Sequence, residues 1–136
     1  MQYKFKENNT KFLSLIPSIT IMLGIFYISH QSQVPQIYLL TTLEDKIQHF
    51  IAFFTLGVCI QFYLMSLNLS FKKIMIITIF FGSLYGVSDE FHQSFVEGRY
   101  VEVLDWVADT VGTVASLSIY KLIKYIFNKI FLKIER

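Results

Sequence analysis

Long stretches without a charged residue limit most strongly what this chain can fold into. Neither Asp, Glu, Lys nor Arg occurs in residues 12–43, 47–71 and 74–88. A fourth apolar stretch begins at residue 110 and continues past two lysines to residue 127. About 20 apolar residues cross a bilayer as a helix, which satisfies its own backbone hydrogen bonds in lipid. We therefore predict an all-α integral membrane protein, a bundle of four transmembrane helices at about residues 12–29, 45–67, 73–91 and 105–125.

The composition agrees with this class. Hydrophobic residues make up 54% of the chain and charged residues 16%, which is too apolar for a soluble domain of this size. A chain of 136 residues has room for one domain. The first apolar stretch is not expected to be a removable signal peptide, because no small-residue cleavage site follows it. Cys59 is the single cysteine, so it cannot form a disulfide within the chain, and we expect a buried, inert thiol.

The charged residues are distributed unevenly between the two predicted sides of the membrane. Ten of the twelve Lys and Arg residues lie in the N-terminal segment, the second connection and the C-terminal segment. The first and third connections carry the other two, together with eight of the ten acids. Since cytoplasmic segments carry the excess of Lys and Arg, both termini are predicted to be cytoplasmic. Basic residues at membrane boundaries do not indicate binding of nucleic acid.

Several acids are expected below the outer membrane surface. Only 15 residues separate Lys73 from Asp89, and 11 separate Asp109 from Lys121, so these helices are shorter than the hydrocarbon layer of about 30 Å. Lysine can reach back to the surface, but aspartate is too short. Ionisable groups at such depth are costly unless they are paired or face water, and they mark functional sites. We expect this position for Asp89, Glu90 and Asp109.

Helical spacing predicts which of these side chains share a helix face. Asp45 and His49 are four residues apart, as are Asp89 and Gln93. On the fourth helix one stripe contains Asp105, Asp109, Gly112 and Ser116. Small residues on that stripe allow close contact between helices. The expected packing residues are Gly57, Gly112 and Ser116.

These patterns predict a polar pocket that opens outward. We expect it between the outer ends of the second, third and fourth helices, partly covered by residues 93–104. Lys46 and Arg99 are the two cations on these segments. They are expected to pair with acids of the cluster, namely Asp89, Glu90, Asp105 or Asp109.

The same residues resemble the VanZ-like family. The motifs that carry the resemblance are Asp45-Lys46-x-x-His49-Phe50 with Phe53 and Leu56-Gly57, then Asp89-Glu90-x-x-Gln93-x-Phe95, Gly98-Arg99, Asp105 and Gly112, and Ser29-His30-Gln31-Ser32. The resemblance extends from the first helix to about Ser116. Three positions depart from the family pattern: Glu97 replaces a usual proline, Asp109 a usual asparagine and Ser116 a common glycine.

The resemblance implies a multi-pass protein of the bacterial plasma membrane, with residues 1–136 as a single VanZ-like transmembrane domain. The founding member of the family is linked to resistance to teicoplanin, a glycopeptide that attacks cell-wall precursors outside the membrane. A role in the cell envelope is therefore implied. A role in the cell envelope agrees with a polar cluster that faces outward.

Our leading hypothesis for function is a binding site for the headgroup of a membrane lipid or of a lipid-linked cell-wall precursor. Phosphate would be bound by basic side chains, with Arg99 giving a bidentate contact. The expected ligand-binding residues are Lys46, His49, Glu90, Gln93, Arg99, Asp105 and Asp109.

Three alternatives remain open. A hydrolase of a lipid or glycan linkage would use a carboxylate as general base, or carboxylates with His49 and His92 around a divalent cation; its catalytic candidates are Asp45, His49, Asp89 and Glu90. The spacing diagnostic of zinc is missing, however, and no metal or other cofactor is predicted. The cluster can also be a purely structural ion-pair lattice. A channel or transporter would need an oligomer, because four short helices leave little room for a pore.

Overall fold

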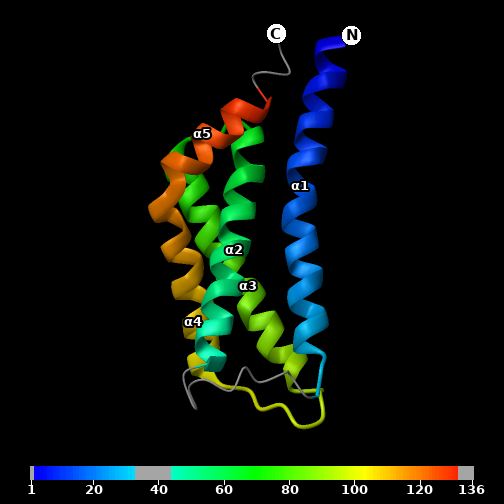
Figure 1. The fold of residues 1–136 in the computed structure, drawn as a ribbon, viewed down its shortest axis with the longest axis vertical. Coiled ribbons are helices and arrows are strands. Elements are labelled where there is room, and N and C mark those ends of the chain that lie inside the picture. Colours follow the sequence, from blue (N-terminus) through cyan, green and yellow to red (C-terminus); the bar gives the residue numbers. More distant parts are fainter. Residues whose placement is uncertain (1, 33–43, 132–136) are drawn as a thin grey trace.

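The computed structural model describes residues 2–32 and 44–131, and these residues form helices joined by short connections (Figure 1). The described part contains no strand, so the all-α prediction is confirmed. The first connection, residues 33–43, and the basic residues Lys133 and Arg136 lie outside it. The elements are α1 (Gln2–Ser29), α2 (Glu44–Ser66), α3 (Phe71–Gln93), α4 (Val103–Ala115), the 3₁₀ turn η1 (Ser116–Ile119) and α5 (Tyr120–Phe131).

Among the described residues, three helices are long and apolar enough to cross a membrane. They are residues Asn9–Ser29 of α1 and the whole of α2 and α3, with mean hydropathies of 1.9, 1.6 and 1.4. Many of their large apolar side chains are exposed, as expected for a surface that faces lipid. The bounds of α2 and α3 lie within two residues of the predicted ones. α1 begins ten residues before the predicted start, because the polar residues that precede the apolar stretch continue the helix.

The predicted continuous helix at residues 105–125 is wrong. α4 ends at Ala115, and η1 connects it to α5, which turns across the end of the bundle (Figure 1). The hydroxyls of Ser116 and Ser118 donate to the carbonyls of Thr113 and Ala115 at 2.6 and 2.7 Å. Such bonds back to the preceding turn often accompany bends in helices. α4 and η1 together rise about 28 Å, which is close to the thickness of the hydrocarbon layer.

Small residues set the distances between α2, α3 and α4. A Cβ atom added to Gly112 would meet the backbone of Phe50, and one added to Gly57 would meet Ser116 and the Thr113 carbonyl. Gly86 of α3 lies in the same way against the side chain of Asp109. α4 is therefore held tightly against α2 and α3. Cys59, expected to be buried, is only partly buried on α2.

The other helices pack through apolar side chains. Ile25 of α1 packs with Phe53 and Leu56 of α2, while Ile123 of α5 packs with Leu64 of α2 at the opposite end of the bundle. Contacts between α1 and α3 are few in comparison with those between α2 and α4. α1 thus packs mainly against α2, and the bundle is loosest between α1 and α3.

Candidate functional site

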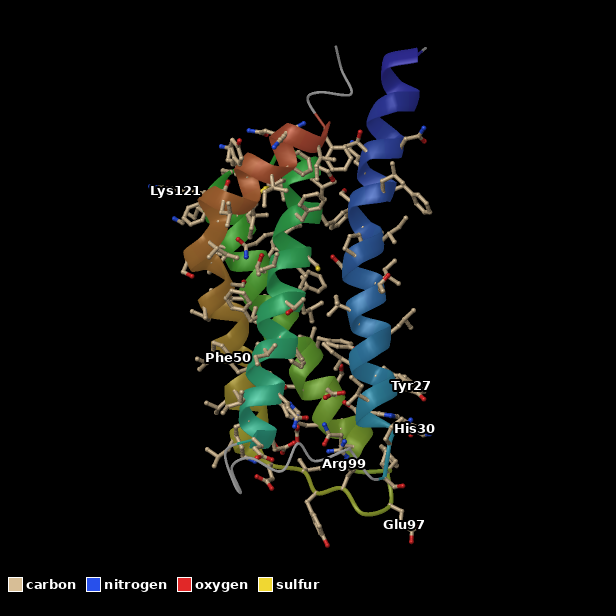
Figure 2. The ribbon with its side chains drawn as sticks, in the orientation of Figure 1. Tyr27, His30, Phe50, Glu97, Arg99 and Lys121 are labelled. Atoms are coloured by element: carbon tan, nitrogen blue, oxygen red, sulfur yellow. The ribbon has the colours of Figure 1, made fainter. Side chains whose placement is uncertain are left out.

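Polar side chains gather where α1 and α3 end and α2 and α4 begin, which we call the acidic end (Figure 2). Lys121 lies toward the opposite end, whereas Glu97 and Arg99 lie at the acidic end (Figure 2). Four carboxylates are buried here, with 0 to 5% of each residue exposed. They are Asp89 and Glu90 from α3, and Asp105 and Asp109 from α4.

Lys46 balances part of this charge. Its Nζ lies 2.8 Å from Asp105 Oδ1, 2.5 Å from Glu102 Oε2 and 3.6 Å from Asp45 Oδ2. The predicted pairing of Lys46 with a buried acid is therefore present. α2 places Lys46 in its first turn, next to the start of α4, so the pair joins the two helix N-termini.

His49 lies between two carboxylates from different helices. Its Nδ1 is 2.9 Å from Asp109 Oδ1, and its Nε2 is 4.0 Å from Asp45 Oδ1. Glu90 lies close by, and its Oε2 accepts a 2.9 Å hydrogen bond from the backbone N–H of Glu102. Among the described residues, two sets of three side chains have the composition of a divalent-cation site, and the ligand atoms of each set lie within 4.8 Å of one another. One set is His49, Glu90 and Asp109, and the other is Asp45, His49 and Asp105.

Asp89 connects the end of α1 to α3. Its Oδ2 accepts hydrogen bonds from Ser29 Oγ at 2.9 Å and from Gln93 Nε2 at 3.1 Å. The four-residue spacing predicts the contact between Asp89 and Gln93. Helical spacing does not predict the contact between Ser29 and Asp89. Only the family resemblance names Ser29 as part of a motif.

Among the described residues, Arg99 does not pair with a buried acid, so the predicted ion pair of Arg99 is wrong. Instead its Nε donates to the Gln31 carbonyl at 3.1 Å and its Nη2 to the Ile28 carbonyl at 3.4 Å. The last carbonyls of a helix lack partners within the helix and carry the negative end of its dipole. The end of α1 therefore attracts the guanidinium. Gly98, with φ +83°, provides the turn before Arg99.

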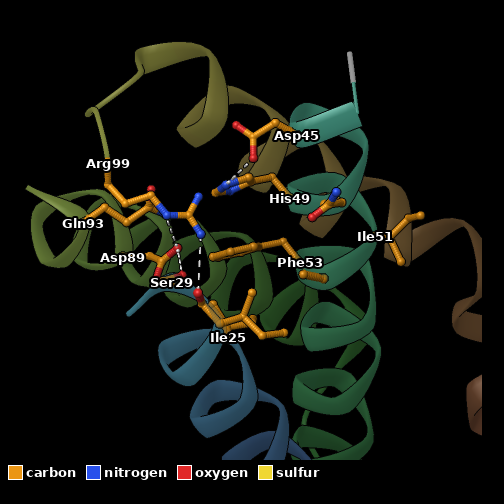
Figure 3. Close-up of a pocket in the computed structure, with 12 residues that line it drawn as sticks. Ile25, Ser29, Asp45, His49, Ile51, Phe53, Asp89, Gln93 and Arg99 are labelled. Carbon is orange, nitrogen blue, oxygen red and sulfur yellow. Dashed lines mark hydrogen bonds and ion pairs between the residues drawn. The ribbon is translucent and has the colours of Figure 1, made fainter. Parts of the chain in front are cut away.

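A cavity of 310 Å³ opens beside this network (Figure 3). It lies between α1, α2 and α3, not between the second, third and fourth helices as predicted, because α4 packs too closely against its neighbours. Its polar lining includes His49, Gln93 and Arg99. Of the other predicted ligand-binding residues, Lys46, Glu90, Asp105 and Asp109 are absent from the lining. The catalytic candidates Asp45 and Asp89 do line it.

Two further polar pairs were not predicted. His30 and His92 lie 3.3 Å apart between Nδ1 and Nε2, at the ends of α1 and α3. The indole N–H of Trp106 on α4 donates to the Ser83 carbonyl of α3 at 3.2 Å. Both pairs join residues far apart in the sequence, and no spacing pattern could have indicated them.

The fold and the site together define a small helical membrane protein with a buried polar network at one end of its bundle. The family model described as VanZ/LLP1 matches residues 1–124. The chain therefore belongs to the VanZ/LLP1 family, and the resemblance of its motifs to VanZ-like proteins is confirmed. No match was found among curated proteins or among solved structures.

Proposed function

We propose that this protein binds a phosphate-bearing lipid at the outer face of the bacterial plasma membrane. The ligand class is a phospholipid or a lipid-linked cell-wall precursor. The observation that carries the proposal is the position of Arg99, which lines a cavity that has both polar and apolar lining residues (Figure 3). Both termini are cytoplasmic in this proposal, so the acidic end lies at the outer surface.

The guanidinium of Arg99 is oriented before any ligand arrives. Two of its five N–H donors are bonded to the carbonyls of Ile28 and Gln31. Three N–H donors have no partner among the described residues and are left for a ligand. An oriented guanidinium matches the geometry of phosphate oxygens. Lys46 is already engaged by three carboxylates. We therefore assign the phosphate contact to Arg99.

The remaining lining suits an amphiphilic ligand. Ile25, Ile28 and Phe53 form the apolar side of the cavity. A second groove of 720 Å³ lies between the same three helices and is lined by Met22, Leu56 and other apolar residues. Met22 and Leu56 are three residues from Ile25 and Phe53, about one helical turn further into the predicted membrane. An acyl or isoprenoid chain attached to the headgroup can follow this direction.

Lipid retention tests the proposal. The variant Arg99→Ala, purified from bacterial membranes in mild detergent, is expected to retain about tenfold less phospholipid or lipid-linked precursor, because a charge-assisted contact is lost. Ile28→Trp should have a similar effect by filling the cavity while leaving Arg99 in place. Mass spectrometry of the co-purified lipids distinguishes the two ligand sources. Teicoplanin sensitivity of the same strains tests the role in the cell envelope.

The control is Lys121→Ala, which removes an exposed basic residue at the opposite end. It should retain lipid as the wild type does. Thermal unfolding of each variant in detergent shows whether the fold persists, since Arg99 also binds the end of α1. If Arg99→Ala and Ile28→Trp both retain the wild-type amount of lipid, the cavity is not the binding site.

A further inference from the structure

Within the described part of the chain, two oxygen atoms at the acidic end lack a hydrogen-bond partner and any ion pair. Asp109 Oδ2 and Glu90 Oε1 are buried, and neither has a hydrogen-bond partner among the described residues. The two residues are 0 and 5% exposed. An unsatisfied buried carboxylate oxygen is costly, and in native proteins it is explained by a partner such as an ordered water or an ion.

The charge around these atoms is also unbalanced. Asp109 and Glu90 face His49, which contributes at most one positive charge to two carboxylates. Lys46 is the nearest lysine in the network, and it is bonded to Asp105, Glu102 and Asp45 instead. A hydrogen-bond lattice of these side chains alone would leave a buried negative charge. A divalent cation would neutralise it.

The geometry fits metal ligation. The 2.9 Å between His49 Nδ1 and Asp109 Oδ1 is a hydrogen-bond distance, and it is also close to the roughly 3.0 Å between two neighbouring ligands at about 2.1 Å from an octahedral ion. His49, Glu90 and Asp109 each offer one ligand atom, and these three atoms lie within 4.8 Å of one another. His49 Nε2 faces Asp45 Oδ1 at 4.0 Å. That distance is too long for a hydrogen bond, so Asp45 lies near the second ring nitrogen without fixing its orientation.

We propose that His49, Glu90 and Asp109 bind one divalent cation between α2, α3 and α4. One imidazole and two carboxylates favour Mn²⁺ or Zn²⁺. The alternative set, Asp45, His49 and Asp105, is less suitable because the Lys46 ammonium lies 2.8 Å from Asp105 and would repel a cation. This site does not include Arg99 and exists whether or not a lipid occupies the cavity.

Metal uptake by the purified full-length protein in detergent tests this site. After treatment with a chelator, the wild type is expected to take up about one Mn²⁺ or Zn²⁺ per chain and to unfold at a higher temperature with the ion than without it. Glu90→Gln should bind the ion about tenfold or more weakly, although its side-chain oxygen can still accept the Glu102 N–H bond. Asp109→Asn should show the same loss.

Glu102→Gln is the matched control, because Glu102 belongs to the acidic end but not to the ligand set. It should bind the ion as the wild type does. The site does not exist if the stripped wild type takes up neither ion, or if Glu90→Gln and Asp109→Asn bind as tightly as Glu102→Gln. The latter result would mean that exposed carboxylates bind the ion adventitiously. Neither outcome depends on lipid retention.

Discussion

Lys46 is the residue whose loss should most disturb the acidic end. Its ammonium lies 2.8 Å from Asp105, whose side chain is 3% exposed. Removing one partner of a buried ion pair leaves an uncompensated buried charge and costs about 3 kcal/mol or more. We predict that Lys46→Met lowers the free energy of unfolding by about this amount. Denaturant unfolding of the purified protein in detergent measures the change.

Two comparisons isolate the pair. Lys121→Met, at an exposed position outside the network, should leave stability nearly unchanged. Adding Asp105→Asn to Lys46→Met should restore part of the loss, because the orphaned charge is removed. Equal stability of Lys46→Met and Lys121→Met would mean that the pair behaves as an exposed surface ion pair.

At this scale the sequence predicts contacts within a helix better than contacts between helices. The spacing of Asp89 and Gln93 predicts their 3.1 Å hydrogen bond, because four residues complete about one turn. The contact between His49 and Asp109 depends on how α2 and α4 are aligned along their axes. Packing of small residues sets that alignment, and no single segment contains the information.

The end of α4 and its position in the bundle could not be predicted from hydropathy alone. Hydropathy predicts an apolar helix across residues 105–125, but it does not register the hydroxyls of Ser116 and Ser118 that bond to the preceding turn. Small residues at helical spacing indicate that α4 packs closely, but they do not specify its position against α2. The predicted position of the cavity is wrong for this reason. α4 packs so closely against α2 that the cavity lies between α1, α2 and α3 instead.

The close approach of α2 and α4 gives a prediction for helix packing. In Gly112→Ala the new Cβ meets the backbone of Phe50, which cannot move aside as a side chain can. We expect a loss of about 1–3 kcal/mol in the free energy of unfolding. Gly24→Ala is the matched control, since nothing lies within 4 Å of a Cβ there. It should be neutral or stabilising by up to about 1 kcal/mol. Similar unfolding curves for both variants would contradict the tight packing.

Across the whole molecule, the charges separate toward the two ends of the bundle. Lys72 and Lys73 begin α3 at the end where α1 starts and α5 lies (Figure 1), while the buried acids occupy the other end. This separation follows the distribution of Lys and Arg in the sequence. The structure shows which segments share an end of the bundle. The positive-inside rule, which depends on loop charges and not on the fold, indicates which end faces the cytoplasm. The two are therefore independent parts of the proposed topology.

Labelling of single cysteines tests that topology. In a Cys59→Ser background, Glu97→Cys places a thiol on the exposed connection at the acidic end, and Lys129→Cys places one on exposed α5. A membrane-impermeant maleimide added to intact bacteria should label Glu97→Cys at once and Lys129→Cys only after lysis, because the basic end faces the cytoplasm. The reverse pattern would place the cavity at the cytoplasmic surface. Arg99 could not then bind a lipid of the outer leaflet, even if its geometry toward phosphate were correct.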